Sequence, residues 1–392
     1  MPRYLPREAE GRLTALLRTF PAVLVVGPRQ CGKSTMVRRS RASWRYVDLE
    51  LTSDYETLAA DPERFLTGHG GRMILDEAQR LPALFPLLRH LIDRTRGNGR
   101  YVLLGSASPA LMRTVSESLA GRAGILELTG FQPSEVAGRT QALDHWFWGG
   151  LPPVYERRGP VARAAWLDAY VSAVLERDLP TLGIRVPAPR LRKLWTMLTH
   201  LQGNLLNHSE LARSLGVSYH TVADYLDILE GAFMIRRLQP FAANVSKRLT
   251  KSPKLYVRDP GILHILAGLR RPGDLEGWMR RGASFEGMVI EQLVARAALH
   301  HVRPEAYFWR TLAGGEVDLL LKLGTRLVPV EIKLGAGVDR HAVAGLRQCM
   351  ADLGIRKGWV VTGSGTRDRL GDDIEIVPWG EVIRGMDGIV PG

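Results

Sequence analysis

Residues 27–34 read Gly-Pro-Arg-Gln-Cys-Gly-Lys-Ser and match the phosphate-loop pattern G-x-x-x-x-G-K-[S/T]. The apolar run 22–26 precedes the loop, and a helical pattern follows from Ser34. A strand, a glycine loop and a helix N-terminus are the context that phosphate binding needs. Glycine lets the backbone curl until successive N–H groups point at phosphate oxygens. The pattern therefore predicts a nucleoside triphosphate site, with ATP as the expected ligand.

Two residues of this loop have specific expected roles. Lys33 is expected to reach the β- and γ-phosphates and assist catalysis, and the Ser34 hydroxyl to ligate Mg²⁺. The other expected ATP-binding residues are Gly27, Pro28, Arg29, Gln30, Cys31, Gly32 and Thr35.

A second acidic motif follows at a suitable distance. The apolar segment 73–75 ends in Asp76 and Glu77. Because parallel strands deliver ligand-binding residues at their carboxyl ends, Asp76 is expected to hold Mg²⁺ through water or through Ser34. Glu77 is expected to orient and deprotonate the attacking water. The pair predicts hydrolysis in addition to binding.

Short apolar strands alternate with helical patterns in the first part of the chain. The expected strands are 22–26, 44–49, 72–77, 101–106 and 124–128, with a helix over 82–96. This alternation predicts an α/β domain, residues 1–140, with a parallel sheet covered on both faces.

The composition bears on the partners and the location of the chain, but it does not determine its function. The chain has 392 residues and a net charge of +13, which favours a polyanionic partner such as DNA or reflects an arginine-rich proteome. Two cysteines, Cys31 and Cys349, are too few for a disulfide framework. The apolar stretches are strand-sized and the N-terminus lacks a signal-peptide pattern, so no membrane association and a cytoplasmic location are expected.

The motifs around the loop resemble a prokaryotic family of AAA+ ATPases related to the archaeal-type ATPases, whose members carry an uncharacterised C-terminal domain. The resemblance rests on residues 27–35, on Leu-Asp-Glu-Ala-Gln at 75–79 and on Leu-Gly-Ser-Ala-Ser-Pro-Ala-Leu at 104–111. It implies that Ser106 or Ser108 is sensor 1, close to the γ-phosphate or the lytic water. It also implies that Arg122 is a candidate arginine finger or sensor. A homo-oligomer is a further expectation.

Residues 141–275 are predicted to be a helical region that contains a winged helix. Residues 207–218 and 219–229 read as a helix-turn-helix with its turn at Gly216, followed by wing strands at 233–238 and 254–257. Acidic residues on the second helix argue against base readout. A basic run suits contacts to the DNA backbone, and a spacer or subunit contact is the alternative. The run comprises Arg236, Arg237, Lys247, Arg248, Lys251 and Lys254.

The remaining residues, 276–392, carry a second cluster of charged side chains. Segments 316–321 and 327–333 read as adjacent strands, so Asp318, Glu331 and Lys333 converge if the strands pair as a hairpin. Two carboxylates can hold Mg²⁺, and a lysine beside them can position or deprotonate the attacking water.

This arrangement resembles the PD-(D/E)xK nuclease superfamily and implies a restriction-endonuclease-like α/β domain. Its members place a glutamate on the preceding helix, for which Glu286 is the first candidate and Glu291 the second. Gln348 lies where some members carry a supporting glutamine. Two alternatives stay open: an active nuclease, or a nuclease-like fold that only binds or assembles.

Three hypotheses about function follow. The chain is an ATP-regulated enzyme that acts on DNA, a signalling switch whose output comes from a partner protein, or a DNA-binding ATPase that does not cut.

Overall fold

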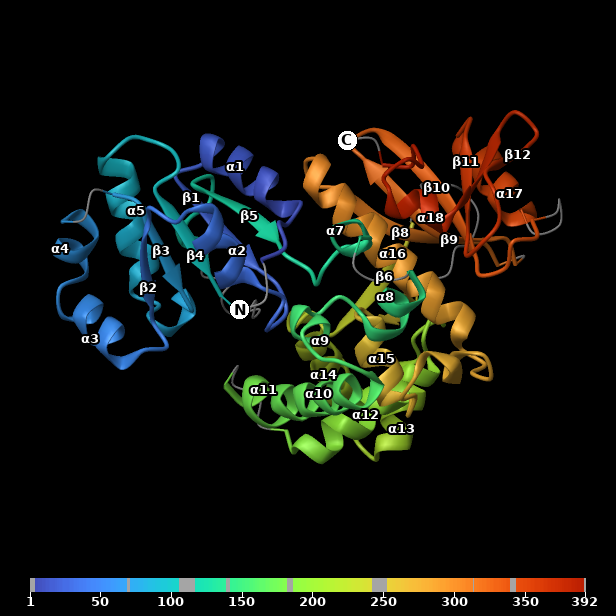
Figure 1. Ribbon diagram of the computed structural model, residues 1–392, viewed down its shortest axis with the longest axis horizontal. Helices are drawn as coiled ribbons and strands as arrows, with labels where there is room; N and C mark the ends of the chain where they lie inside the picture. The colour runs from blue at the N-terminus through green and yellow to red at the C-terminus, as the bar shows by residue number, and fades with distance from the viewer. Residues whose placement is uncertain are drawn as a thin grey trace. The chain divides into compact units, whose positions relative to one another are not determined.

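The computed structural model describes residues 4–68, 71–105, 117–138, 142–181, 186–241, 252–312, 314–338 and 343–390 (Figure 1). The chain divides into two compact units, and each is described by itself. Unit 1 comprises residues 1–131, 151–153 and 231–233, and unit 2 comprises the rest. The predicted boundary at residue 275 lies inside unit 2, so the helical region and the C-terminal domain pack together.

Unit 1 contains the predicted parallel sheet. Its strands run in the order β2-β3-β4-β1-β5, and every neighbouring pair is parallel. They are β1 (Ala22–Val26), β2 (Arg45–Asp48), β3 (Met73–Asp76), β4 (Tyr101–Leu104) and β5 (Ala123–Glu127). The central strands β1, β3 and β4 are buried throughout, which explains their continuous apolar sequences.

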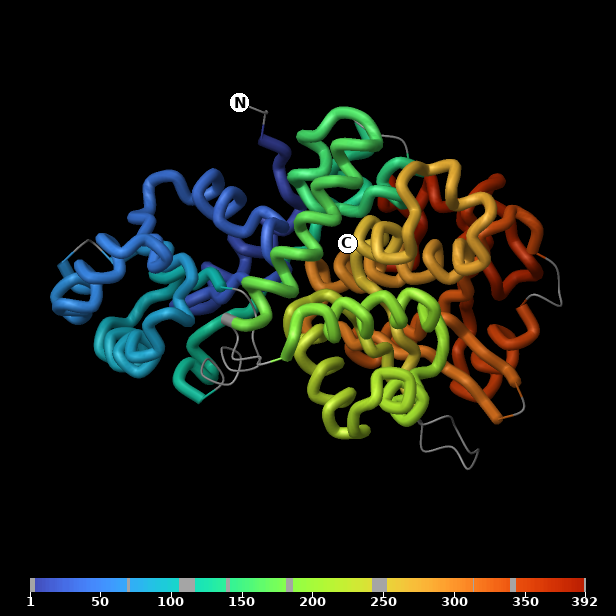
Figure 2. Tube along the Cα trace, turned by 90° about the horizontal axis from the view of Figure 1, so that it is seen from below, coloured from blue at the N-terminus to red at the C-terminus, as the bar shows by residue number. Residues whose placement is uncertain are grey.

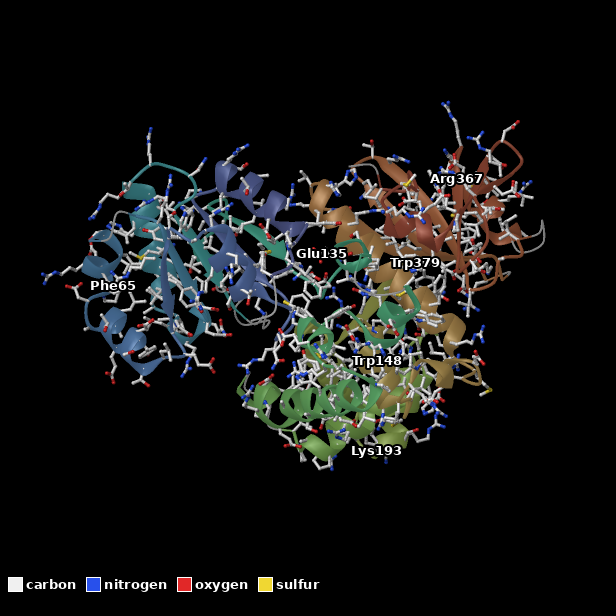
Figure 3. All side chains as sticks on the ribbon, viewed as in Figure 1. Phe65, Glu135, Trp148, Lys193, Arg367 and Trp379 are labelled. Carbon is white, nitrogen blue, oxygen red and sulfur yellow. The ribbon has the colours of Figure 1, made fainter. Side chains whose placement is uncertain are left out.

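Helices complete unit 1 and bury its core. They are α1 (Ala9–Thr19), α2 (Lys33–Ser40), α3 (Thr52–Ala60), α4 (Pro62–Thr67), the short η1 (Ala78–Arg80) and α5 (Leu84–Arg94). Helix α1 packs on β1 and β5, whereas α2 packs on β3. Phe65 of α4, labelled in Figure 3, contributes to the core. The guanidinium of Arg45 lies 4.3 Å from the centroid of the Phe65 ring. The predicted helix over 82–96 corresponds to α5.

The helical part of unit 2, green in Figure 2, lies mainly between residues 142 and 231. Its helices are α7 (Pro133–Val136), α8 (Ala142–Trp148), α10 (Pro160–Ala173), α11 (Leu179–Thr181), α12 (Ala188–His200), α13 (His208–Leu215) and α14 (Tyr219–Gly231). A π-helical segment, η2 (Val174–Asp178), links α10 to α11, and α9 (Pro152–Tyr155) lies at the unit boundary. Gly216 ends α13 in the left-handed conformation, with φ of 65°, at the predicted turn before α14.

An eight-stranded sheet forms the rest of unit 2, in the order β12-β13-β11-β10-β9-β8-β6-β7. The strands are β6 (Ile235–Pro240), β7 (Lys254–Val257), β8 (Glu305–Arg310), β9 (Glu316–Leu323), β10 (Arg326–Lys333), β11 (Gly358–Thr362), β12 (Asp368–Leu370) and β13 (Ile374–Pro378). The helices beside it are α15 (Pro260–Leu266), η3 (Pro272–Leu275), α16 (Arg281–His300), α17 (Ala344–Leu353) and α18 (Trp379–Ile383).

The two strands expected to form a wing join this sheet. Strand β6 pairs with β7 in an antiparallel manner and with β8 in parallel. The β6–β7 pair is therefore the edge of the eight-stranded sheet, and it brings Lys254 and Tyr256 toward residues of α16 and β9.

Candidate functional site

The phosphate loop in unit 1 depends on two glycines. Gly27 has φ of 152°, and a Cβ there would lie 2.0 Å from the carbonyl oxygen of Leu128. Gly32 has φ of 98° and directly precedes α2, which begins at Lys33. A side chain at Gly27 would collide with backbone, and an L-residue at Gly32 would be strained. These glycines thus shape the loop and place the helix N-terminus after it.

Two basic side chains hold the loop from inside. Lys33 is buried, and its Nζ donates to the carbonyl oxygens of Gly27 and Pro28, each at 2.9 Å. Arg7, ahead of α1, donates to the carbonyl oxygen of Cys31 at 2.9 Å and to that of Gly130 at 2.8 Å. Arg7 therefore ties the loop to the segment after β5. Arg7 could not be predicted as a loop partner from the sequence, because a single arginine before a helix forms no recognisable pattern.

The other predicted loop residues lie as follows. The side chain of Cys31 is fully buried, Gln30 has a left-handed φ of 59°, and Thr35 is exposed on the first turn of α2. Arg29 lies close enough to Glu77 for its charge to act on that carboxyl. Burial of Cys31 favours a packing role for this side chain.

Asp76 ends β3, and β4 separates β3 from β1. Its side chain is 5% exposed. The Tyr46 hydroxyl donates to Asp76 Oδ2 at 2.6 Å, and the Glu77 N–H donates to Oδ1 at 3.0 Å. Each oxygen keeps a lone pair free, so the Asp76 carboxylate can ligate a Mg²⁺ that takes its remaining ligands from phosphates and water. Ser34 lies on the first turn of α2, directly after Lys33. Tyr46 was also missed, because only the pairing of β2 with β3 brings it to Asp76.

Glu77 has a strained backbone conformation, and its carboxylate is held by a hydrogen bond. Its φ of 52° is left-handed, a conformation that non-glycine residues adopt at a cost. The Gln79 amide donates to its carboxylate. Burial raises the pKa of Glu77, and the charge of Asp76 adds to this effect, while Gln79, Lys33 and Arg29 oppose it. A carboxylate with a raised pKa beside the loop is suited to accept a proton from water.

Of the three residues that the AAA+ resemblance implies, only Arg122 lies within the described residues. Ser106 and Ser108 lie outside the described residues. Arg122 immediately precedes β5 and donates to both carboxylate oxygens of Asp93, at 2.6 and 2.9 Å. Since β5 is parallel to β1, Arg122 lies at the amino edge of the sheet, opposite the loop. Arg122 therefore does not reach a γ-phosphate bound in its own chain.

In unit 2, the structure brings together the carboxylates predicted for a nuclease-like site. The antiparallel register pairs Leu319 with Val330, which sets Asp318 opposite Glu331. The Ile332 N–H donates to Asp318 Oδ2 at 2.9 Å, and Lys333 Nζ contacts Glu331 Oε1 at 2.6 Å. The predicted hairpin geometry is present.

Glu286, on α16, joins this cluster through Lys254 of β7. Lys254 Nζ lies 3.2 Å from Glu286 Oε1, 3.4 Å from Asp318 Oδ1 and 2.5 Å from Glu316 Oε1. The Tyr256 hydroxyl also donates to Glu286 Oε1. Lys254 was expected among the DNA contacts, because its strand was predicted to be part of a wing.

Burial and mutual repulsion determine the ionisation of these carboxyls. Burial, followed by the charge of Asp318, raises the pKa of Glu286 to about 7 and that of Glu331 to about 8. Burial alone would lower the pKa of Lys254, but the surrounding carboxylates hold it well above its ordinary value. Lys254 is therefore an ammonium at neutral pH.

The second candidate for the helix glutamate has a different role. Glu291 is buried and binds the guanidinium groups of Arg236 and Arg258. Burial opposes its ionisation, but these two charges lower the pKa of Glu291 to about 2. Gln348 lies on α17, where its Oε1 faces Gly315, next to the start of β9.

Much of the basic run expected to contact DNA is neutralised inside unit 2. Arg236 pairs with Glu291, Arg237 with Asp227 and Glu230, and Lys254 with the carboxylate cluster. Lys247, Arg248 and Lys251 lie outside the described residues. The expected contact of Lys254 with phosphates is therefore wrong, because this side chain is buried against carboxylates. Contact of Arg236 and Arg237 with phosphates stays a prediction.

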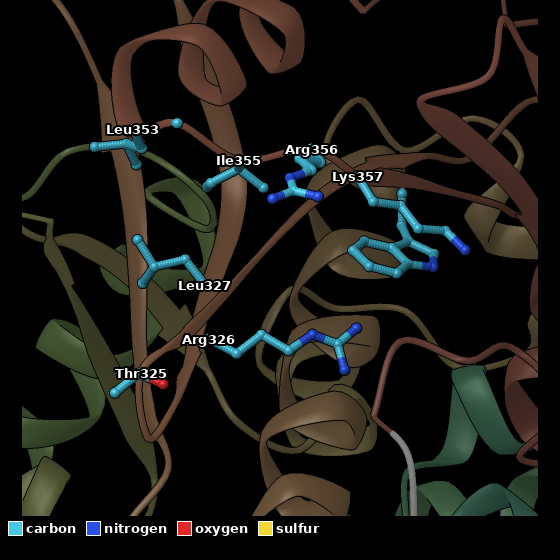
Figure 4. Close-up of a pocket in the computed structure, with 9 residues that line it drawn as sticks. Thr325, Arg326, Leu327, Leu353, Ile355, Arg356 and Lys357 are labelled. Atoms are coloured by element: carbon cyan, nitrogen blue, oxygen red, sulfur yellow. The ribbon is translucent and has the colours of Figure 1, made fainter.

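A different group of cations surrounds a pocket of about 330 Å³ in unit 2. Figure 4 shows Arg326, Arg356 and Lys357 gathered there. The buried side chain of Trp359 also lines this pocket, with its ring centroid 5.6 Å from the Arg326 guanidinium and 5.4 Å from Lys357 Nζ. Among the described residues, its Nε1 has no hydrogen-bond partner. Arg367, labelled in Figure 3, shares Glu375 with Lys357.

Sequence comparison places the chain among known proteins. Rv2008c of Mycobacterium tuberculosis and Mb2031c of Mycobacterium bovis, both uncharacterised, are each 41% identical to it over 380 residues, 96% of this chain and 84% of theirs. The chain belongs to their family. Within it, residues 19–137 match an AAA domain, and residues 139–273 and 281–382 match two domains of unknown function. The AAA domain supports ATP binding by unit 1.

Comparison of structures gives more distant likenesses. The Walker-type ATPase paby2304 of Pyrococcus abyssi is 16% identical, with a TM-score of 0.47, over 67% of this chain and 96% of that one. The Thermotoga maritima RuvB Holliday junction branch migration motor is 20% identical, with a TM-score of 0.30, over 58% and 88%. The assignment to the family does not depend on either. None of the helices in the described ranges is long and apolar enough to span a membrane.

Proposed function

We propose that this family member is a Mg²⁺-dependent ATP hydrolase whose active site lies at the carboxyl edge of the sheet in unit 1. The observation that carries the proposal is the meeting of the Lys33 loop with Asp76 and Glu77. Strands β1 and β3 end at the same edge, and the charges of Lys33 and Arg29 act on the Glu77 carboxyl.

Each residue has a distinct role in this proposal. The loop N–H groups and the N-terminus of α2 bind phosphate oxygens, and Lys33 turns from the loop carbonyls to the β- and γ-phosphates. Ser34 and Asp76 hold the metal, which when bound neutralises charge on the phosphates. Glu77 orients water and accepts its proton, and Arg7 keeps the loop in register.

Replacement of Lys33 tests the site. Lys33→Ala should abolish ATP hydrolysis and weaken binding of a fluorescent ATP analogue, because the phosphates lose their buried cation. Arg122→Ala, which removes a cation from the opposite edge, is the matched control and should keep turnover in the isolated chain. Full hydrolysis by Lys33→Ala would show that the site is assigned wrongly.

We further propose that ATP turnover is coupled to DNA bound by unit 2 through its phosphate backbone. The cations around Trp359 support this, because Lys357, Arg367 and Arg369 share the two carboxylates of Glu375 and Glu381, and Arg326 and Arg356 add two further positive charges. Replacing Arg326 and Arg356 by Gln should lower the salt dependence of DNA binding by about 2 in log–log slope. Arg89→Gln with Arg96→Gln is the control, and an unchanged slope in the Arg326 and Arg356 double variant would refute this surface.

Two forms of the DNA hypothesis differ in whether Asp318, Glu331 and Lys333 cut. The position of Lys254 supports the form that does not cut. Cleavage of linear, branched or single-stranded DNA with Mg²⁺ or Mn²⁺, lost in Asp318→Ala, would establish the cutting form. Self-assembly and a cytoplasmic location remain part of the proposal, the latter supported by two buried free thiols.

A further inference from the structure

Lys254 occupies the centre of the carboxylate cluster in unit 2. It is 3% exposed, and its ammonium lies within 3.4 Å of oxygens from Glu286, Glu316 and Asp318. An ammonium has three N–H donors, so these three carboxylates can satisfy it completely. The lysine comes from β7, outside the segment that carries the nuclease-like motif.

A divalent metal in a nuclease-like site would need the same oxygen atoms. Glu286 Oε1 and Asp318 Oδ1 both face Lys254 Nζ. A Mg²⁺ requires carboxylate oxygens at about 2.1 Å in octahedral geometry, which leaves no room for an ammonium bound to the same atoms. Within the described part of the chain, no three His, Cys, Asp or Glu side chains are grouped to hold a metal.

We infer that the Lys254 ammonium takes the place of a divalent cation, so that unit 2 is a nuclease-like domain whose site neither binds metal nor cuts DNA. The inference rests on the proposed nuclease-like character of unit 2 and is independent of ATP hydrolysis in unit 1. The carboxylates then join β7, β9 and α16 through an internal cation, and unit 2 serves as a binding module.

The lysine is held in place by its own strand. Lys254 pairs with Leu238 of β6, and its backbone also bridges to Leu205. Two residues further on, the Tyr256 hydroxyl donates to Glu286. The backbone of Lys254 is therefore fixed within the sheet, and its side chain is buried among the carboxylates.

The charges of the cluster are nearly balanced without a metal. Four carboxylates, those of Glu286, Glu316, Asp318 and Glu331, face three cations. These cations are Lys254, Lys333 and Arg310, which lies 3.2 Å from Glu316. The remaining buried oxygen, Glu331 Oε2, has no hydrogen-bond partner among the described residues. One proton on this carboxyl completes the balance.

Metal binding by the whole 392-residue chain tests the inference. Mn²⁺ binding would be measured by electron paramagnetic resonance in an Asp76→Asn background, which removes the metal ligand of unit 1. With Lys254 intact, this protein should bind no more Mn²⁺ than the Asp76→Asn, Asp318→Asn double variant. Binding that depends on Asp318 while Lys254 is present would overturn the inference.

A second variant asks whether Lys254 itself excludes the metal. Lys254→Met in the same background should gain one Mn²⁺ per chain, and Asp318→Asn should remove it. Lys322→Met, which removes a half-buried lysine of β9 that pairs with Glu305, should gain none. A folded Lys254→Met protein that binds no Mn²⁺ would contradict the inference. If this variant fails to fold, the comparison of the Asp76→Asn protein with the Asp76→Asn, Asp318→Asn protein still tests the inference. ATP hydrolysis by the unmodified chain, measured separately, tests the proposal for unit 1.

Discussion

At the scale of single residues, the groups that carry the ATPase proposal are controlled by side chains far away in sequence. Asp76 is held by Tyr46, and the phosphate loop is held by Arg7. The partner of Glu77 is local, because Gln79 is only two residues away. Hydrogen bonds to metal ligands of this kind fix orientation, and their loss reduces metal affinity or activity by about 10- to 100-fold.

The Gln79 contact predicts a change in the pH dependence of hydrolysis. Burial raises the pKa of Glu77, so turnover should fall with decreasing pH at a higher pH than for an ordinary glutamate of about 4.3. Gln79 stabilises the ionised carboxylate. Gln79→Ala should therefore move this acid limb to still higher pH, measured as kcat against pH at saturating ATP.

Gln239→Ala is a suitable control for this profile, because Gln239 is an exposed residue of β6 in unit 2. An acid limb that is the same in Gln79→Ala and in the unmodified chain would mean that Glu77 is not the titrating base.

Much of the nucleotide site follows from local sequence, whereas its supports do not. The glycine spacing and the apolar run before Asp76 are contiguous signals, so the loop and the acidic pair could be predicted. The distance of Arg122 from the loop could also have been predicted. Arg122 precedes a parallel strand, whereas Asp76 ends one, so the two residues lie at opposite edges of the sheet. The contacts of Lys254 could not be predicted, because they depend on the pairing of β6 with β8, a long-range pairing that no local pattern encodes.

At the scale of elements, a buried hydrogen-bonded chain joins three helices of unit 2. His264 of α15 contacts the Phe147 carbonyl oxygen through Nδ1 at 2.8 Å and Ser284 Oγ of α16 through Nε2 at 2.7 Å. Trp146 of α8 donates to the same Ser284 Oγ at 3.0 Å. The neutral imidazole, with its proton on Nδ1, satisfies both contacts.

This chain predicts that unit 2 loses stability in mild acid. Burial lowers the pKa of His264 to about 4, below its unfolded value of about 6.5. A depressed folded pKa gives stability that is present above pH 6.5 and lost as the pH falls toward 4. At pH 5 the loss from His264 should be about 2 kcal/mol, from about 1.4 kcal/mol per pH unit.

Urea unfolding at pH 7 and pH 5 measures this loss. His264→Asn keeps a donor for the Phe147 carbonyl but does not titrate, so its stability should fall less between the two values. Asp259, whose pKa burial raises to about 6, acts in the opposite direction in both proteins and cancels from the comparison. Equal losses in the two proteins would contradict the role of His264.

At the scale of the whole molecule, the two units differ in whether their buried carboxylates are paired with cations of the same unit. In unit 1, Asp76, Glu77 and Lys33 lie around the phosphate loop. This arrangement suits a reaction whose transition state gains negative charge. Unit 2 pairs its carboxylates internally with Lys254, Lys333 and two arginines, Arg236 and Arg258. This contrast supports catalysis in unit 1 and binding in unit 2.

The most direct measurement of the central claim is ATP hydrolysis and ATP binding by Glu77→Gln beside the unmodified chain. Gln keeps the size of the side chain but cannot accept a proton from water. We predict unchanged ATP binding with turnover reduced by about 100-fold or more, or about 2.7 kcal/mol in the barrier. Hydrolysis by Glu77→Gln at the rate of the unmodified chain would contradict the proposed active site.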